Sequence, residues 1–269
     1  MQGLERFVPT DLKVDYLNAL LKVGYHTLDC GSFVSPRAIP QMRDTAEVLD
    51  RIDSDSSTLL SVIVANERGI DDAVQHDRVT YLGYPFSISE TFQQRNTNRS
   101  VEESLPVVEH LLTQTSKAGK EVVIYISMGF GNPYGDVWQP DLVASWVERL
   151  IAMGITSFSI SDTVGVSDAD KITSVFELLR AFDQAEFGAH FHTRPDDWKE
   201  KVDAAWKSGC ARFDGAISGF GGCPMAADKL VGNMPTENLI SYFDQAGIST
   251  GLDEARFNEA RVLAAQIFG

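Results

Sequence analysis

Hydrophobic residues follow two alternating patterns along the 269-residue chain. Short apolar runs predict strands that are buried on both faces. The longer segments between them repeat apolar residues every three or four positions and predict amphipathic helices. Strands that alternate with helices in this way are typical of a parallel sheet covered by helices.

The predicted elements cover almost the whole chain. Strands are expected at 25–29, 59–64, 78–82, 121–126, 155–160, 187–191 and 211–213. Helices are expected at 10–23, 41–51, 70–75, 100–117, 140–153, 168–182 and 197–208, and two or three more end the chain.

Local residues mark some helix starts. Thr10 is a candidate N-cap, and Ser100-Val-Glu-Glu103 has the pattern of a capping box. The aromatic and basic segment 92–99 is expected to be an exposed loop, although its Arg95 and Arg99 could also meet anionic phosphates.

The strand count points to a fold class. A (β/α)₈ TIM barrel needs one strand more than is found and would have to place it before Thr10, whereas an open doubly wound sheet needs no such strand. The glycine-rich nucleotide-binding fingerprints of open sheets are absent from the strand–helix turns. We therefore predict one TIM-barrel domain over residues 1–269 that lacks its first strand and carries extra C-terminal helices.

Charge and composition exclude several classes of function. The chain has 23 Lys and Arg against 38 Asp and Glu, which gives a net charge of −15. Such a chain is not expected to bind nucleic acid or an anionic membrane, because both need a basic surface. We see no apolar run long enough to span a bilayer and no secretory signal.

The cysteines bear on the compartment. Cys30, Cys210 and Cys223 are an odd and sparse set, which fits free thiols in a reducing compartment, so a cytoplasmic protein is expected. Cys30 and Cys210 are interpreted as small core residues.

Candidate chemistry collects where the strands end, which is where TIM barrels place their active sites. These positions include Asp29, Asp162, His190 and Asp214. His190 and His192 are two residues apart on a strand, so their imidazoles face the same side. Two convergent imidazoles are a natural ligand pair for a divalent transition metal. The alternative is two unrelated polar residues at the end of a strand.

Three further candidates stay open on the sequence alone. Cys223, on the glycine-rich loop 219–224, could donate a proton or act as a nucleophile, or the loop could be a structural turn. Asp162 could serve acid–base chemistry or cap a helix. Asn233 could offer a carbonyl oxygen to a metal or simply occupy a turn.

Four motifs together resemble the metal-dependent TIM-barrel carbon–carbon lyases of the 3-hydroxy-3-methylglutaryl-CoA (HMG-CoA) lyase family. They are Gly31-Ser-Phe-Val-Ser-Pro36 with Pro40-Gln-Met42, Ser161-Asp-Thr-Val-Gly-Val166, His190-Phe-His192, and Gly219-Phe-Gly-Gly-Cys-Pro-Met-Ala226 followed by Gly232-Asn233. They occur in the family's order across nearly the whole chain.

The resemblance implies a retro-Claisen cleavage of HMG-CoA to acetyl-CoA and acetoacetate, the chemistry of leucine degradation and ketone-body formation. It implies that His190, His192 and Asn233 bind Mg²⁺ or Mn²⁺. It also implies that Cys223, Asp162 and Asp29 are catalytic, that Ser32 and Thr163 bind substrate, and that an acyl-CoA-binding homodimer forms. A metal eases loss of the hydroxyl proton, and a thiol is a suitable donor of the proton that the product enolate needs.

The chain departs from the family in two places. Asp29 stands where the family usually has Glu, which shortens the side chain by one methylene. Family members also open with a strand that ends in Arg-Asp, and here Gln2 matches a residue just beyond it. That Asp is a metal ligand in the family, and hard cations prefer carboxylate oxygens. We therefore expect a native product with roughly 15 to 20 more N-terminal residues, by analogy with the family's usual length for this segment.

Two other functions stay open. The chain could be a condensing enzyme, or a lyase for another 3-hydroxyacyl-CoA or a 2-oxo acid, such as a citramalyl-type substrate. It could also be a catalytically silent binding protein, because the Arg-Asp motif is absent.

Overall fold

Strands followed by helices make up most of the chain in the computed structural model, which describes residues 1–4, 6–222 and 231–269. The chain divides into two units by its internal contacts. One unit contains Met1–Gly83, Thr113–Glu121 and Phe243–Gly269, and the other contains Tyr84–Leu112 and Val122–Tyr242. Strand β3 (Val79–Ser87) contributes to both.

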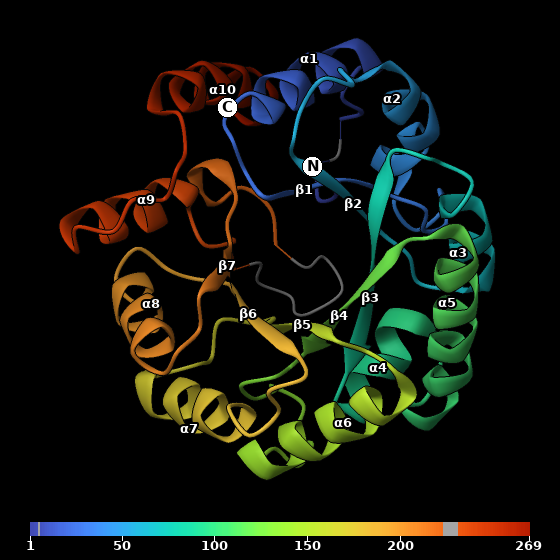
Figure 1. The fold of residues 1–269 in the computed structure, drawn as a ribbon, viewed down its shortest axis with the longest axis vertical. Helices are drawn as coiled ribbons and strands as arrows, with labels where there is room; N and C mark the ends of the chain where they lie inside the picture. Colours follow the sequence, from blue (N-terminus) through green and yellow to red (C-terminus); the bar gives the residue numbers. More distant parts are fainter. Residues whose placement is uncertain (5, 223–230) are drawn as a thin grey trace. The chain divides into compact units, whose positions relative to one another are not determined.

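The first unit places three strands in sequence order, β1–β2–β3, with parallel pairing. Its elements are α1 (Thr10–Leu21), β1 (Thr27–Ser32), η1 (Pro40–Met42), α2 (Thr45–Arg51), β2 (Leu59–Ile63), α3 (Glu67–Ala73) and α10 (Glu254–Phe268). Helices α1 and α10 lie side by side (Figure 1), and the rings of Tyr16 and Phe268 meet edge to face with centroids 6.0 Å apart.

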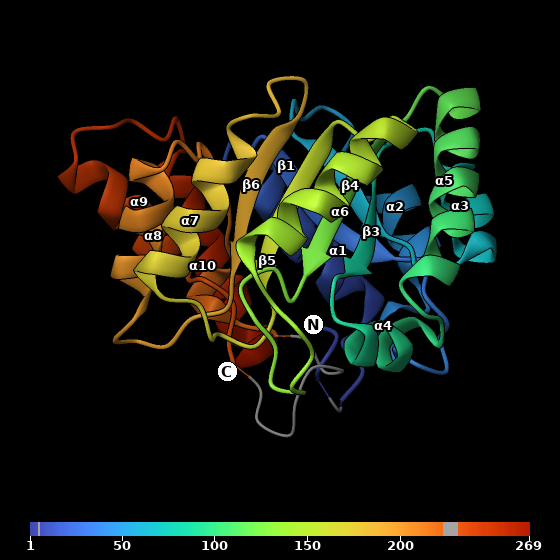
Figure 2. The same ribbon diagram turned by 90° about the horizontal axis from the view of Figure 1, so that it is seen from below.

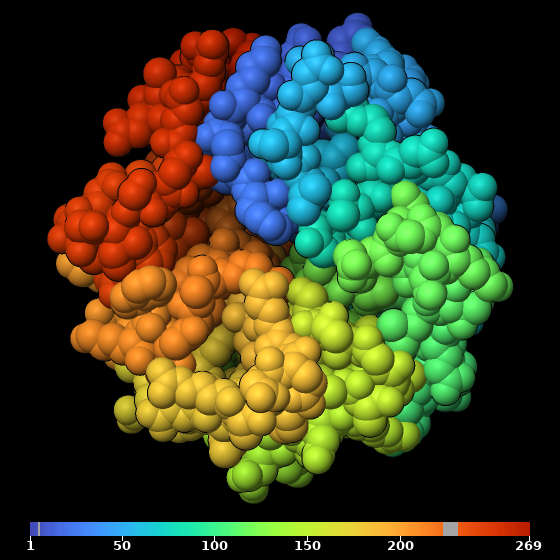
Figure 3. Space-filling view, in the orientation of Figure 1, coloured from blue at the N-terminus to red at the C-terminus, as the bar shows by residue number. Residues whose placement is uncertain are grey.

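The second unit continues the order β3–β4–β5–β6–β7, and β4 to β7 pair in parallel. The elements that lie wholly or partly in this unit are α4 (Glu90–Thr97), η2 (Glu102–Ser104), α5 (Leu105–Ala118), β4 (Glu121–Ser127), α6 (Pro140–Met153), β5 (Ser157–Asp162), α7 (Ala169–Leu179), β6 (Glu186–Phe191), α8 (Trp198–Lys207), β7 (Arg212–Asp214), η3 (Ile217–Gly219) and α9 (Thr236–Gln245). The last part of α5, the first residue of β4 and the end of α9 belong to the first unit. Helices α6 and α7 pack side by side (Figure 2), as do α7 and α8, which form neighbouring gold and orange surfaces in Figure 3.

Strand β5 shows how this sheet separates its two faces. Its sequence Ser-Phe-Ser-Ile-Ser-Asp alternates small polar residues with larger ones, and alternate residues point to opposite faces. Phe158 stacks on Phe187 of β6, with ring centroids 5.4 Å apart. On the other face, Ser159 donates a hydrogen bond to Asp214 of β7 at 2.7 Å. One face is therefore apolar up to Asp162 at the end of the strand, and the other carries hydroxyl and carboxylate groups.

Several predictions of local structure are confirmed. Ser100 and Glu103 form the expected capping box, with each backbone N–H bonded to the other side chain. Cys30 and Cys210 are buried, and burial raises the pKa of each thiol to about 12, as expected for core residues. Seven strands are found among the residues described, the number that the sequence predicts. That the whole chain forms a single barrel domain stays a prediction.

Three local predictions are wrong. Pro9, not Thr10, precedes the first helix, and the Thr10 hydroxyl donates to Asp44 instead. The segment expected as an exposed loop contains helix α4, in which Phe92 is 1% exposed. The helix could not be predicted from its polar sequence, because only Phe92 and the adjacent Gln93 are buried. The buried amide of Gln93 accepts the backbone N–H of Ser87 and donates to the hydroxyl of Ser104.

Strand β1 begins and ends later than predicted, so Asp29 lies within the strand and not at its end. Asp29 is exposed, whereas Ser32, the last residue of β1, is buried. No helix in the described part of the chain is both long enough and apolar enough to cross a membrane.

Candidate active site

His190 and His192 lie together at the carboxyl end of β6, as their spacing predicts. Their ring centroids are 5.6 Å apart. Asn233 is opposite His192 in an antiparallel bridge, in which Thr193 and Met234 donate to the carbonyl groups of Gly232 and Phe191. Directly opposed residues on antiparallel segments project to the same face, with Cβ atoms about 4.5 to 5.5 Å apart. The two imidazoles and the amide therefore share one face.

The imidazole of His192 is the least satisfied group in this cluster. The residue is 3% exposed, and its Nδ1 is buried without a hydrogen-bond partner among the described residues. Burial, followed by the charge of His190, lowers the pKa of His192 from 6.5 to about 3. A neutral imidazole is the form that binds a metal, and an unpaired buried nitrogen is costly unless something occupies it.

His190 is oriented by a carboxylate on the neighbouring strand. Its Nδ1 is 3.0 Å from Oδ2 of Asp214, which also accepts the hydroxyl of Ser159. Burial acts to raise the pKa of Asp214, but the hydrogen bond and charge of His190 outweigh it and leave that pKa below its usual value. With Nδ1 bonded to the carboxylate, Nε2 is the ring nitrogen that would be used if His190 bound a metal, as in carboxylate–histidine–metal arrangements.

The amide of Asn233 is oriented by a hydrogen bond to the glycine-rich loop. Its Nδ2 donates to the carbonyl of Phe220 at 2.9 Å, and this fixes which end of the amide points away. Gly221 permits that contact, because a Cβ at this position would lie 2.5 Å from Nδ2 and its φ is +109°. The glycines of this loop are thus needed for the close approach of the backbone to Asn233.

Asp162 projects to the face opposite His190, because it follows Ser161, the residue paired with His190. It is 1% exposed, and its carboxylate accepts the backbone N–H groups of Val166 and Ser167. Lys201 of α8 completes its surroundings, with Nζ 2.9 Å from Oδ2. Asp162 therefore stabilises the turn after β5, whereas Asp168 caps the helix α7, so the prediction that Asp162 caps a helix is wrong. A direct role in acid–base chemistry stays a prediction.

The remaining predicted site residues are differently placed. Thr163 is buried and accepts the backbone N–H of Met128, which has a positive φ of 59°. Ser32 is buried in the first unit, where it caps a turn by accepting the N–H of Val34. Cys223 lies outside the described residues.

The donor set fits a divalent cation in part. Two imidazoles and an amide oxygen are on one face, and a buried imidazole nitrogen has no other partner in the described structure. Two imidazoles and an amide bring no negative charge, and no cluster of three His, Cys, Asp or Glu side chains suited to a metal was found in residues 1–4, 6–222 and 231–269. Imidazole nitrogens suit transition ions better than Mg²⁺, so Mn²⁺ is the first to test of the two ions that the resemblance implies.

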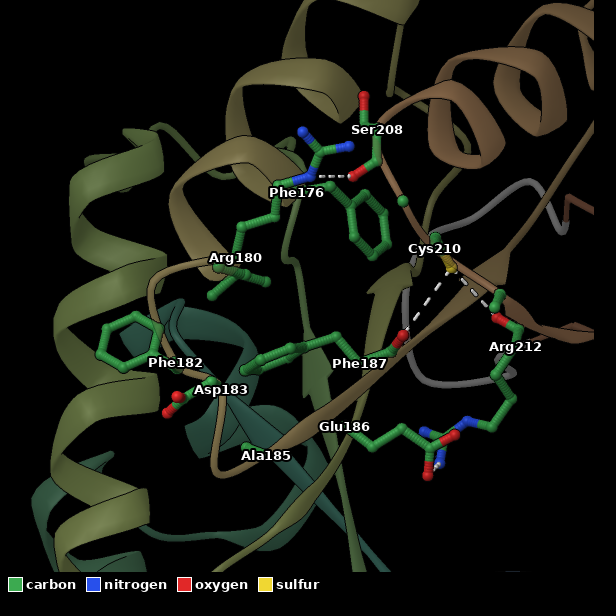
Figure 4. A pocket seen from close by; sticks show the side chains of 13 residues that line it. Phe176, Arg180, Phe182, Asp183, Ala185, Glu186, Phe187, Ser208, Cys210 and Arg212 are labelled. Atoms are coloured by element: carbon green, nitrogen blue, oxygen red, sulfur yellow. Dashed lines mark hydrogen bonds and ion pairs between the residues drawn. The ribbon is translucent and has the colours of Figure 1, made fainter.

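A cavity of about 280 Å³ lies at the other end of the same strands. Figure 4 shows its lining, with Glu186 and Phe187 from the start of β6 and Arg212 from the start of β7. The Arg180 guanidinium donates to the carbonyl of Ser208, and Arg212 donates to Ser157. The imidazole pair is not among the cavity's lining residues.

Sequence reasoning missed the part played by Lys201. It lies in a segment predicted as an ordinary surface helix. A clue was present, because Trp198, Lys201, Val202 and Ala205 occur at the spacing of one helix face, so a lysine interrupts an apolar stripe.

Comparisons with known proteins identify the family of the chain. A model of the HMGL-like family matches residues 1–263. The chain is 32% identical over 261 residues to the cytoplasmic 3-hydroxy-3-methylglutaryl-CoA lyase of Rattus norvegicus, with 97% of this chain and 76% of the relative covered. It is 32% identical over 245 residues to the hydroxymethylglutaryl-CoA lyase of Pseudomonas mevalonii, with 90% and 80% covered.

Solved structures give the same result. The HMG-CoA lyase of Brucella melitensis superposes with a TM-score of 0.91 at 28% identity, covering 99% of this chain and 94% of that one. An HMG-CoA lyase of Acinetobacter baumannii, solved in complex with coenzyme A and 3-methylmalate, has a TM-score of 0.91 at 29% identity, covering 98% and 86%.

Proposed function

The chain belongs to the HMGL-like family, and from that premise we propose that it is a carbon–carbon lyase that cleaves HMG-CoA to acetyl-CoA and acetoacetate. One observation on this chain supports the proposed chemistry. His190, His192 and Asn233 share a face, and the buried Nδ1 of His192 has no partner within the described residues.

The metal ligands of this proposal are His190, His192 and Asn233. A divalent ion bound there, Mn²⁺ or Mg²⁺, would make the tertiary hydroxyl of the substrate more acidic. The chain's own residues prepare this position. Asp214 orients the His190 ring, and the contact with Phe220 turns the amide oxygen of Asn233 away from the loop.

Cleavage requires two proton movements. The hydroxyl of the substrate loses its proton as the carbon–carbon bond breaks, and the bonding electrons leave on the acetyl-CoA fragment as an enolate. The enolate must then be protonated to give acetyl-CoA. We propose the thiol of Cys223 as the donor, because an ordinary thiol pKa of about 8.5 allows it to give up a proton near neutral pH.

Other roles stay proposals with less support. Asp162 supports the turn after β5, and Thr163 holds the backbone of Met128, so both would act through the shape of the site. Roles for Asp29 and Ser32 rest on the resemblance alone. So do the homodimer, the cytoplasmic location and the closed TIM barrel, although the parallel order of the strands in each unit and the similar lyase structures support the barrel. The complex of a similar lyase with coenzyme A supports an acyl-CoA as the substrate.

A substrate panel tests the proposal. The full chain is incubated with Mn²⁺ and either HMG-CoA or citramalyl-CoA, and acetyl-CoA is measured by a coupled assay. We expect release from HMG-CoA. Release from citramalyl-CoA alone would assign another substrate, and acyl-CoA binding without any release would identify a silent homologue.

A further inference from the structure

Lys201 is a buried cation that the proposed chemistry does not use. It lies on α8 and is 1% exposed. Its Nζ is 2.9 Å from Oδ2 of Asp162, 3.3 Å from Oδ2 of Asp197 and 3.1 Å from the carbonyl oxygen of His192. An ammonium group has three N–H donors, and three acceptors surround this one.

These contacts fix the main chain of His192 from both sides. The N–H of His192 donates to the backbone carbonyl of Asp162 at 3.3 Å, and the carbonyl of His192 accepts from Lys201. The carboxylate of Asp162 also accepts the backbone N–H groups of Val166 and Ser167. One ion pair therefore ties together the turn after β5, the end of β6 and the helix α8.

Stability alone is a weak explanation for this arrangement. Buried ion pairs can often be replaced by apolar residues without loss of stability, because desolvation offsets much of their attraction. The contact with the carbonyl of His192 is different, since it acts on the residue whose Nδ1 is buried without a partner among the described residues. The pair holds the main chain from which that imidazole projects.

We propose that Lys201 is a positioning residue that holds His192 in the orientation needed to bind a divalent metal. This inference rests on the proposed function for the identity of the ligand at His192. Residues that orient metal ligands without touching the metal typically change metal affinity 10- to 100-fold, on the order expected for Lys201.

The test compares Lys201→Met with Lys207→Met. Both lysines are on α8 and each pairs with an aspartate four residues earlier, but Lys207 is 71% exposed and touches no part of the site. Mn²⁺ affinity of the EDTA-stripped full chain is measured by titration calorimetry, and kcat and KM are measured with HMG-CoA. We expect Lys201→Met to weaken Mn²⁺ binding about 10- to 100-fold and to lower kcat more than it raises KM. Lys207→Met should match the wild type.

A second variant covers the case in which Lys201→Met leaves Asp162 unpaired and does not fold. Asp162→Asn with Lys201→Met removes both charges of the pair and still removes the donor to the His192 carbonyl. We expect this double variant to unfold cooperatively and to bind Mn²⁺ as weakly as the single variant. Wild-type Mn²⁺ affinity in whichever of these variants folds would overturn the positioning role.

A readout without metal separates this inference from the proposed function. In the EDTA-treated protein, hydrogen exchange at the His192 amide should be at least about tenfold faster in the double variant than in Lys207→Met, because the opposite side of that residue is no longer held. Equal exchange would overturn the inference. A wild-type protein that binds Mn²⁺ but releases no acetyl-CoA would refute the lyase and leave this comparison intact.

Discussion

The two ends of strands β5 to β7 differ in how their polar groups are satisfied. At the amino end, Arg212 donates to Ser157 and pairs with Glu186, and a cavity of about 280 Å³ lies beside them (Figure 4). At the carboxyl end, Asp214 satisfies one nitrogen of His190, but Nδ1 of His192 is buried without a partner in the part of the chain that the structure describes.

The difference shows that a cavity and an unsatisfied ligand atom need not occur at the same place. At the amino end, Arg180 and Arg212 form hydrogen bonds with carbonyl, hydroxyl and carboxylate groups of the fold. These two guanidinium groups therefore stabilise the fold. The carboxyl end holds the imidazole of His192, whose pKa is lowered by burial and whose Nδ1 has no hydrogen-bond partner among the described residues. Parallel barrels place their chemistry at the carboxyl end, and the unsatisfied group is found there.

Removing the imidazole at the carboxyl end should have the largest effect. His192→Ala is expected to reduce both Mn²⁺ affinity and acetyl-CoA release by more than about 100-fold, beyond the range seen when only the partner of a ligand is lost. His26→Ala is the control, because His26 is exposed and the hydrogen bond found for its side chain is to the neighbouring Thr27. Full acetyl-CoA release by His192→Ala would remove the basis for assigning chemistry to this end.

Asp214 and Asp183 allow a matched test with one aspartate at each end. Asp214→Asn should weaken Mn²⁺ binding about 10- to 100-fold, because an amide orients the His190 ring less strongly than a carboxylate does. Asp183 lines the cavity and is exposed, so Asp183→Asn should leave Mn²⁺ binding unchanged. Equal Mn²⁺ affinities in the two variants would show that Asp214 does not orient a metal ligand.

The low pKa of His192 predicts how stability depends on pH. The unfolded residue binds a proton near pH 6.5, whereas the folded one does so near pH 3, so between these values the unfolded state holds more protons. Stability therefore falls as the pH is lowered through this window. Between pH 7 and pH 5 this residue should reduce the free energy of unfolding by about 2 kcal/mol.

Urea titrations of the EDTA-treated protein at the two pH values measure this effect. The His192→Asn variant has no group to titrate at this position, so its loss of stability between pH 7 and pH 5 should be smaller by that amount. The same loss in both proteins would mean that His192 is not held neutral by the fold.

The smallest effect on activity is expected at the amino end. Arg212→Met removes hydrogen bonds to Ser157 and to the backbone of Phe158, so the free energy of unfolding should fall by about 1 to 3 kcal/mol. Acetyl-CoA release measured well below the unfolding temperature should be unchanged. A large loss of kcat in the folded variant would show that the two ends do not differ in function as described.

Short-range sequence patterns predicted much of the fold and the convergence of the two imidazoles. Helix α6 has the predicted bounds because proline at its start and glycine after its end both act locally. The convergence of His190 and His192 follows from the two-residue period of a strand. Helix α4 was missed because its few buried residues leave no apolar periodicity in a polar segment.

Contacts between distant segments could not be predicted. The bonds of Asp162 depend on the face of the sheet to which the last residue of β5 points. The strand was predicted at 155–160, two residues too early, so the position of Asp162 at the end of the strand was not predicted. Lys201 is 39 residues away in sequence, and only the packing of α8 against the strand ends brings it to Asp162. The partnership of His190 and Asp214 likewise requires the register of β6 and β7.

Metal dependence of the cleavage tests the central claim most directly. The full chain is stripped with EDTA, and acetyl-CoA release from HMG-CoA is followed before and after Mn²⁺ or Mg²⁺ is restored. If His190, His192 and Asn233 hold a divalent cation that the cleavage needs, the stripped protein should release no acetyl-CoA, and release should recover when the ion is restored. Undiminished release in excess EDTA would contradict it.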